Sequence, residues 1–181
     1  DAATAATFGE APAAAAPAPE PPLALPPKGF VKLRGLKNAA EHNGKVGVTG
    51  DYDAEAGRHT VKLQDGTQLR LKPANLLQML QVRLTGLSGE HARHNAEEGT
   101  IFDYDDESNM YGVEMAGGEA VPVAAENVLL PDRSYATVHG LQGAPHYNGQ
   151  IGQVLEYVEG SGRYLVNVGG GKHLKLKRAN L

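Results

Sequence analysis

Apolar and polar residues alternate in short runs along most of the chain after residue 30. In Val31-Lys32-Leu33 two apolar side chains flank a charged one, and the same spacing returns between Val61 and Leu63. A period of two is typical of a β-strand with one buried face and one exposed face. Asn-Gly and Asp-Gly pairs lie between the runs and favour tight turns. The pattern therefore predicts many short strands and an all-β fold.

This alternating pattern is written three times in tandem. The copies span residues 31–80, 81–130 and 131–181, and we call them repeats 1, 2 and 3. Such self-similarity predicts three modules rather than one large domain. Counterparts lie 52 and 53 residues apart from the first polar loop onward. The shared columns are Asn43, Asn95 and Asn148; Gly47, Gly99 and Gly152; Tyr52, Tyr104 and Tyr157; Val61, Val113 and Val166; Gly66, Gly118 and Gly171; and Asn75, Asn127 and Asn180.

Each repeat of about fifty residues contains four or five predicted strands. Asp65-Gly66 marks the hairpin between the third and fourth strands of repeat 1. Pro73 has no N–H and cannot continue a ladder, so Pro73-Ala74-Asn75 predicts a short helical turn. Short strands with one apolar face each close most naturally into a small barrel.

The repeats resemble the Src-homology-3-like (SH3-like) barrel. More narrowly, they are similar to repeat modules of algal and protist proteins with the pattern G-L-x(4–7)-[HY]-N-G-x-x-G-x-V-x-x-Y…R-[HY]-x-V-x-L…G-x-x-L-x-L-K-P-x-N-L. The resemblance covers residues 31–181 and implies three tandem SH3-like small barrels. It implies little about function, because small barrels serve many unrelated functions.

The repeats differ at several positions. Repeat 2 has Ala96 where the others have Gly44 and Gly149, and it lacks the lysine that precedes the closing Asn elsewhere. Repeat 3 stops at Leu181, where a fifth strand would begin, so either the chain continues or another segment completes that barrel. The connecting segments 77–81 and 129–136 are short, which favours barrels packed in a row over a flexible string.

Residues 1–30 are Ala/Pro-rich and have no hydrophobic periodicity. This composition predicts an extended, polyproline-like tail or linker. The alternative is an anchor that orders on a partner, with Leu23, Leu25 and Phe30 as contacts. A chain that begins at Asp1 suggests removal of a targeting segment, for which organelle import is one cause; a fragment or tag removal would look the same.

Charge is distributed unevenly over a chain with a net charge of −4. Repeat 1 carries +3, repeat 2 carries −8 and repeat 3 carries +3. A basic–acidic–basic row is hard to reconcile with one continuous groove for a polyanion, because the middle repels phosphate. The acidic middle is either a solvated surface or an electrostatic docking patch.

Candidate catalytic and metal-binding motifs are sparse. His91 and His94 form an H-x-x-H pair, but two histidines fall short of a zinc site, and His94 shares its column with His42 and Tyr147, which favours packing. The acidic segment 103–109 lacks the central Gly of a calcium loop. The chain has no Cys, which excludes disulfides. We expect no enzyme, no metal, no cofactor and no small-molecule substrate.

Aromatic rings instead recur in two columns and predict either core packing or a platform for a protein partner. The acidic cluster beside the middle ring adds a candidate docking charge, and the apolar residues of the N-terminal segment add candidate contacts. The candidate partner-binding residues are therefore Tyr52, His59, Tyr104, Tyr111, Tyr157, Tyr164, Asp103, Asp105, Asp106, Leu23, Leu25 and Phe30.

These features predict a non-catalytic structural or adaptor protein that binds protein subunits of a larger assembly. The algal character of the repeats and the N-terminal composition favour an organelle. The specific expectation is a peripheral accessory subunit of a photosystem–antenna supercomplex at the chloroplast thylakoid of an alga. No run reaches the roughly 18–20 apolar residues that cross a bilayer, so membrane contact is expected only through the complex.

The alternative is a KOW- or Tudor-like protein that binds nucleic acid or a ribosome, because those modules are also small SH3-like barrels. Such binding should weaken steeply with salt. The basic residues available to contact phosphate are Lys32, Arg34, Lys37, Arg70 and Lys72 in repeat 1, and Lys172, Lys175, Lys177 and Arg178 in repeat 3.

Overall fold

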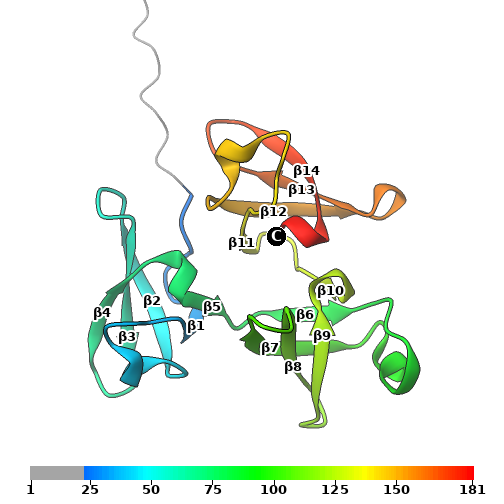
Figure 1. Ribbon diagram of the computed structural model, residues 1–181, viewed down its shortest axis with the longest axis horizontal. Coiled ribbons are helices and arrows are strands. Elements are labelled where there is room, and N and C mark those ends of the chain that lie inside the picture. The colour runs from blue at the N-terminus through cyan, green and yellow to red at the C-terminus, as the bar shows by residue number, and fades with distance from the viewer. Residues whose placement is uncertain (1–22) are drawn as a thin grey trace, which may run out of the picture.

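The computed structural model describes residues 23–181, and the predicted character of residues 1–22 lies outside that range. The described chain is all-β, as predicted, with three antiparallel sheets (Figure 1). Sheet 1 has the order β4-β3-β2-β1-β5 and is open, with β4 and β5 at its edges. Its strands are β1 (Phe30–Leu33), β2 (Val46–Asp53), β3 (Arg58–Leu63), β4 (Gln68–Leu71) and β5 (Leu76–Gln78).

Sheet 2 repeats this order in the next part of the chain, and sheet 3 repeats it without a counterpart of β5. Sheet 2 runs β10-β6-β7-β8-β9, and sheet 3 runs β11-β12-β13-β14. The strands of sheet 2 are β6 (Gln81–Leu84), β7 (Glu98–Asp105), β8 (Met110–Met115), β9 (Ala120–Ala124) and β10 (Val128–Leu129). Those of sheet 3 are β11 (Tyr135–Thr137), β12 (Ile151–Val158), β13 (Arg163–Asn167) and β14 (His173–Lys177).

Short 3-10 helices of three to six residues are the helical elements of the described residues. The helical turn predicted at Pro73–Asn75 is confirmed, and it recurs at the same place in the other repeats. The turns are η1 (Ala40–His42), η2 (Pro73–Asn75), η3 (Gly89–His94), η4 (Ala125–Asn127), η5 (Pro145–Tyr147), η6 (Glu159–Ser161) and η7 (Arg178–Asn180).

The glycine column of the second strand is required by close packing. A Cβ at Gly99 would lie 2.5 Å from Val113 Cγ1, and one at Gly152 would lie 2.5 Å from Val166 Cγ1. Real Cβ atoms do not approach so closely, so a larger residue would push the two strands apart. A β-bulge follows this Gly at the matching position of all three sheets, and it bends the long strand.

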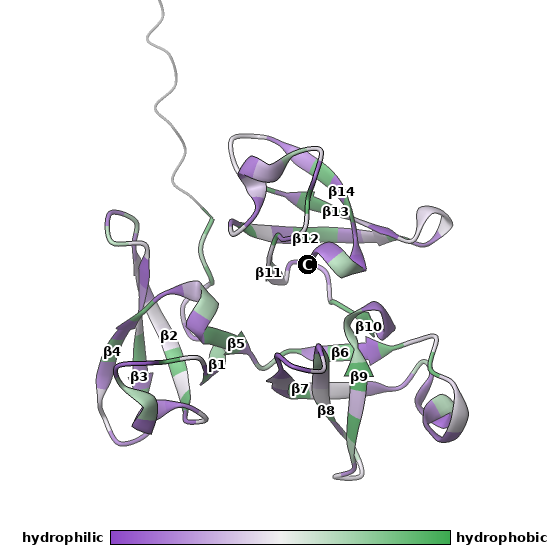
Figure 2. Ribbon diagram, viewed as in Figure 1, coloured by the Kyte–Doolittle hydropathy of each residue, from purple (hydrophilic) through white to green (hydrophobic). Residues whose placement is uncertain are grey.

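Each repeat has its own hydrophobic core, built from the inward residues of the alternating strands. Figure 2 shows hydrophobic and hydrophilic residues alternating along the strands. Val61, Val113 and Val166, which share one sequence column, are fully buried, one in each core.

The three sheets lie around a common centre rather than in a row (Figure 1). The prediction of a row was wrong because repeat 3 folds back on repeat 1. Ile151 of repeat 3 packs into the core of repeat 1, and Gln78 Nε2 donates a hydrogen bond of 2.6 Å to the Tyr135 carbonyl. The short connections keep consecutive repeats in contact, but they do not determine the angle between one repeat and the next.

Candidate partner-binding surfaces

The two aromatic columns predicted from the sequence meet as one ring pair in each repeat. Tyr104 and Tyr111 have centroids 4.8 Å apart, and Tyr157 and Tyr164 have centroids 5.0 Å apart. The matching pair in repeat 1 is Tyr52 with His59, at 4.6 Å. Cross-strand pairing of the two columns brings the rings together, because Tyr104 lies opposite Tyr111 in the ladder.

In repeats 1 and 3 the buried ring of the pair accepts a hydrogen bond from the chain segment that precedes the repeat. His59 is fully buried and its Nε2 accepts a hydrogen bond of 3.3 Å from the Leu25 N–H. In repeat 3 the Tyr164 hydroxyl, equally buried, accepts a hydrogen bond of 3.0 Å from the Leu130 N–H. Burial lowers the pKa of His59 and raises the pKa of Tyr164. These two candidates are therefore part of the architecture.

The N-terminal residues 23–29 dock on repeat 1 as the linker 130–134 docks on repeat 3. Both segments read Leu-Pro-x-[Lys/Arg], and Lys28 and Arg133 both have positive φ. The N–H of each donates a 2.7 Å hydrogen bond to a carbonyl of the long strand. Leu25 is buried in the core of repeat 1, whereas Phe30 is 64% exposed. Leu23 packs on the rim of the same core.

Two of the three candidate acids join repeat 2 to repeat 1. Asp103 lies 3.0 Å from Lys32 Nζ, and Asp106 forms an ion pair with Arg34. The Arg34 guanidinium also stacks over the Tyr104 ring, 4.6 Å from its centroid. The acidic middle repeat therefore complements basic side chains of its own neighbour, and two residues expected to contact phosphate are engaged within the chain.

Asp105 has a different role, because it organises the turn between β7 and β8. It accepts a hydrogen bond of 2.9 Å from the Glu107 N–H and one of 2.8 Å from the Ser108 hydroxyl. The backbone bond from Glu107, followed by the Ser108 hydroxyl, lowers the pKa of the Asp105 carboxyl. Asp105 is exposed and carries a full negative charge at neutral pH.

His94 is buried, as packing predicts, but its partners are polar. Its Nδ1 lies 2.7 Å from Glu97 and its Nε2 lies 3.4 Å from Glu119. Among residues 23–181 no group of three His, Cys, Asp or Glu side chains is placed to hold a metal ion.

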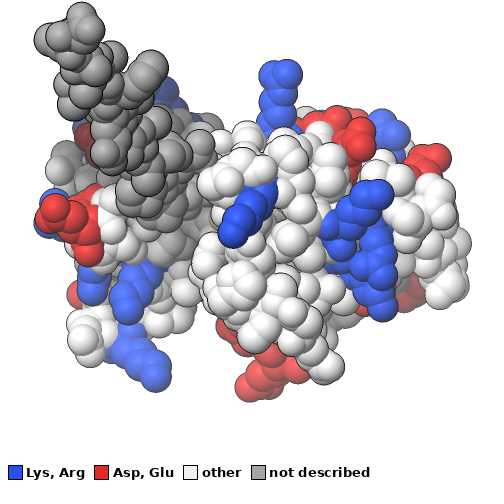
Figure 3. Space-filling view, turned by 90° about the horizontal axis from the view of Figure 1, so that it is seen from above, with Lys and Arg blue, Asp and Glu red and all other residues white. Residues whose placement is uncertain are grey.

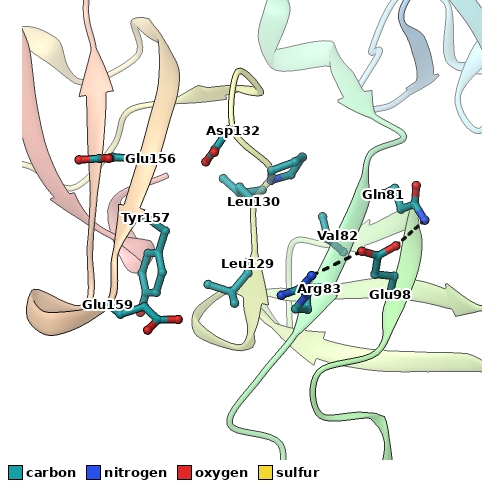
Figure 4. A pocket seen from close by; sticks show the side chains of 11 residues that line it. Gln81, Val82, Arg83, Glu98, Leu129, Leu130, Asp132, Glu156, Tyr157 and Glu159 are labelled. Carbon is teal, nitrogen blue, oxygen red and sulfur yellow. Dashed lines mark hydrogen bonds and ion pairs between the residues drawn. The ribbon is translucent and has the colours of Figure 1, made fainter.

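A groove of about 770 Å³ separates repeats 2 and 3 (Figure 4). Its floor is the linker that joins the two repeats, with Leu129, Leu130 and Pro131. One wall carries Arg83, Gln81, Val82 and Glu98, and the other carries Tyr157, Glu156 and Glu159; Asp132 stands beside the floor.

The groove is apolar at its base and acidic at its rim. Glu98 is held on one wall by Gln81 at 2.9 Å and by Arg83 at 3.8 Å. Asp132, Glu156 and Glu159 are exposed. Together with Glu98 they give the lining four carboxylates, against the single guanidinium of Arg83. Their combined field favours a cationic group in the groove.

Side chains of repeat 3 hold the two walls of the groove together by bonding to the backbone of repeat 2 and of the linker. Arg178 stacks 4.6 Å from the Tyr157 centroid and donates hydrogen bonds to the Tyr157 hydroxyl and to the Glu126 carbonyl of repeat 2. The bond from the Leu130 N–H to Tyr164 pins the floor to the same wall. A preformed groove binds a partner without the cost of ordering its own walls.

Basic side chains on the surface do not join into one stripe. Figure 3 shows Lys and Arg in separate groups on the face it presents, with acidic side chains at several places around them. This distribution gives no continuous path for a nucleic-acid backbone across that face.

Neither the protein-family models nor the curated proteins gave a match to this sequence. In residues 23–181 the helical elements are short 3-10 turns, none long and apolar enough to cross a bilayer. The groove between repeats 2 and 3 was missed from the sequence. The available signal was the linker 129–136, where apolar residues and Pro131-Asp132 stand together without a counterpart in the first linker.

Proposed function

We propose that this protein is a non-catalytic adaptor that binds a basic segment of another protein in the groove between repeats 2 and 3. One observation carries the proposal: the groove has an apolar floor, a rim of four carboxylates with one guanidinium, and walls fixed by contacts between the repeats. Apolar contact supplies affinity in such an interface, and complementary charge supplies orientation and association rate.

The acidic rim selects against the alternative, a nucleic-acid or ribosomal ligand. Phosphate would meet Asp132, Glu156 and Glu159 at the groove, and two basic residues of repeat 1 are already paired with acids of repeat 2. A protein segment with Lys or Arg and neighbouring apolar side chains fits both the charge and the floor.

Two finer assignments form part of the proposal. Each repeat is proposed to be an SH3-like small barrel, supported by the recurring strand order and by the 3-10 turn that follows the fourth strand. The larger assembly is proposed to be a photosystem–antenna supercomplex at the thylakoid of an algal chloroplast, with this protein as a peripheral accessory subunit. That placement rests on the resemblance of the repeats to algal modules.

Site-specific photocross-linking tests the function directly. A benzoylphenylalanine replaces Glu156 in the groove wall or, as a control, Glu55 in an exposed turn of repeat 1. The full chain is incubated with an extract of the native source, irradiated, and treated with nuclease. The groove position should yield a protein adduct that high salt present during irradiation reduces, and the control position should not.

Two outcomes contradict the proposal. One is an adduct at Glu156 that nuclease removes, which would assign nucleic acid to the groove. The other is equal cross-linking from Glu156 and Glu55, which would show that the groove has no preferred partner.

A further inference from the structure

A second hollow lies on the outer face of repeat 2, away from the groove between the repeats. It has a volume of about 420 Å³ and is formed by β7, β8 and β9 with the turn after β7. Apolar side chains make its floor, and two carboxylates stand at its rim. Asp103 is paired with Lys32 of repeat 1, whose Nζ lies 6.0 Å from the Phe102 ring centroid. Asp105 is therefore the carboxylate left for a ligand. The lining includes Phe102, Met110, Pro122, Asp103, Asp105 and Ser108.

A glycine shapes the floor of this hollow. The Phe102 ring lies against Gly112, where an added Cβ would be 2.9 Å from Phe102 Cζ. Gly112 corresponds to Thr60 in repeat 1 and to Leu165 in repeat 3. Repeat 2 alone therefore has room for an aromatic ring on this face.

Repeats 1 and 3 cover the same face with an arginine of their own. Arg58 Nη1 donates a hydrogen bond of 3.0 Å to the Arg70 carbonyl, and Arg163 Nη1 donates one of 3.3 Å to the Lys175 carbonyl. In repeat 2 the arginine position is Met110, which cannot donate a hydrogen bond.

The acceptor position in repeat 2 is Pro122, on the edge strand β9 opposite Gly112. Its carbonyl can accept the hydrogen bond that an arginine gives in the other repeats. The rim supplies the matching charge, since the Asp105 carboxyl is held ionised by the Glu107 N–H and the Ser108 hydroxyl. Repeat 2 thus keeps the receptor for a guanidinium while lacking the guanidinium itself.

We propose that this hollow, lined by Phe102, Met110, Pro122 and Asp105, binds an arginine of a second protein partner, carried on an extended segment with apolar neighbours. The guanidinium takes the place that Arg58 and Arg163 occupy in the other repeats, donates to the Pro122 carbonyl and faces Asp105. Apolar side chains beside the arginine cover Phe102 and Met110. This site is separate from the groove between repeats 2 and 3, and it gives the adaptor a second point of attachment.

A synthetic peptide provides the probe. Acetyl-Ala-Leu-Arg-Leu-Ala-amide is titrated into the ¹⁵N-labelled full chain, and the same peptide with citrulline in place of arginine serves as the control. Amide shifts should be confined to residues 102–112, 120 and 121. Citrulline keeps the shape but loses the charge, so it should bind about tenfold more weakly or worse, because a charge-assisted hydrogen bond contributes about 1.5–3 kcal/mol.

Met110→Arg restores the arginine of the other repeats, so this variant should fold, fill its own hollow and abolish the shifts. Ala116→Arg adds the same charge at an exposed position outside the hollow and should leave binding unchanged. If Met110→Arg does not give a dispersed spectrum, Asp105→Asn replaces it and should weaken binding by about tenfold.

Equal binding of the two peptides would overturn the proposal, as would unchanged binding to a folded Met110→Arg variant. So would concentration-dependent sedimentation that Met110→Arg abolishes while the peptide has no effect, since that result would assign the hollow to a second copy of this chain.

Discussion

Repeat 2 and its two neighbours are built on the same inward residues but present different outward ones. The column of Val61, Val113 and Val166 is fully buried in all three. On the outer face, however, repeats 1 and 3 carry Arg58 and Arg163 where repeat 2 carries Met110. Positions that all three repeats share build the fold, and positions where one repeat departs are where a partner can be recognised.

The net charges of the repeats follow the same division. Repeat 2 carries −8 and the flanking repeats carry +3 each. Some of these opposite charges attract each other within the molecule, where Lys32 pairs with Asp103 and Arg34 pairs with Asp106. Glu119 pairs with Arg93 inside repeat 2, and Asp105 stands at the rim of the hollow. The groove takes Glu98 from repeat 2, whereas its other carboxylates, Asp132, Glu156 and Glu159, come from repeat 3. An uneven charge along a repeat protein can therefore serve assembly of the chain and recognition of a partner together.

The largest effect is expected from the shared architecture. Gly99→Ala places a Cβ 2.5 Å from Val113 Cγ1 and 2.9 Å from the Glu114 carbonyl oxygen, and overpacking of this kind should cost about 3 kcal/mol of unfolding free energy. Gly117→Ala, with open space around it, is the matched control. Urea unfolding followed by circular dichroism measures both. Equal midpoints for the two variants would show that the Gly column is not a packing constraint.

A smaller loss is expected from the first polar loop. The Asn95 side chain accepts a 2.8 Å hydrogen bond from the Leu87 N–H and donates a 2.9 Å bond to the Leu87 carbonyl. Asn95→Ala should lower the unfolding free energy by about 2 kcal/mol, since two hydrogen bonds are lost. Asn43→Ala and Asn148→Ala remove the same clamp in the other repeats and should behave alike. A loss in one repeat only would argue against a common architecture.

Most of the architecture within each repeat could be predicted from the sequence, because strand alternation, turn residues and the closing helical turn each depend on residues close together in the chain. Alternation along the strands, turn residues and the Pro-Ala-Asn segment predicted the elements, and three aligned copies identified the Asn, Gly and ring columns. The positions of the repeats relative to one another could not be predicted, because they depend on contacts such as Gln78 with Tyr135, which no periodicity records. The groove between repeats 2 and 3 was missed for the same reason.

Contacts between repeats should contribute less than contacts within them. Arg34→Ala removes an ion pair with Asp106 and the stacking on Tyr104. Because Asp106 is exposed, the pair should couple by about 0.5–1 kcal/mol. A double-mutant cycle of Arg34→Ala with Asp106→Ala, measured by urea unfolding, gives the coupling. It should shrink in high salt, and a coupling of zero at low salt would contradict this interface.

The smallest expected effect is a pH dependence of segment docking that is present in repeat 1 and absent from repeat 3. Burial holds the pKa of His59 below its ordinary value of about 6.5, so the unfolded chain binds a proton more readily than the folded chain. Docking of residues 23–29 should therefore be fully stable above that value and weaken as the pH falls toward the lowered pKa. The protection factor of the Leu25 amide, which is its deuterium-exchange rate compared with that of an unstructured peptide at the same pH, reports this docking through its bond to His59.

His59→Tyr installs the residue that repeat 3 uses at the same position, and it should remove the pH dependence of the Leu25 protection factor. The protection factor of the Leu130 amide, which is held by Tyr164, serves as an internal reference that should stay constant over the same range. Parallel acid sensitivity at Leu25 and Leu130 would assign the effect to another group.

Hydroxyl-radical footprinting of the complex isolated from its native source tests the central claim most directly. If repeat 2 and the adjoining groove are the partner-binding surfaces, Phe102, Met110 and Tyr157 should lose reactivity relative to the free chain. Tyr52 and Phe30 of the first sheet should keep theirs. Protection of Tyr52 and Phe30 with no change at Phe102, Met110 and Tyr157 would contradict the account.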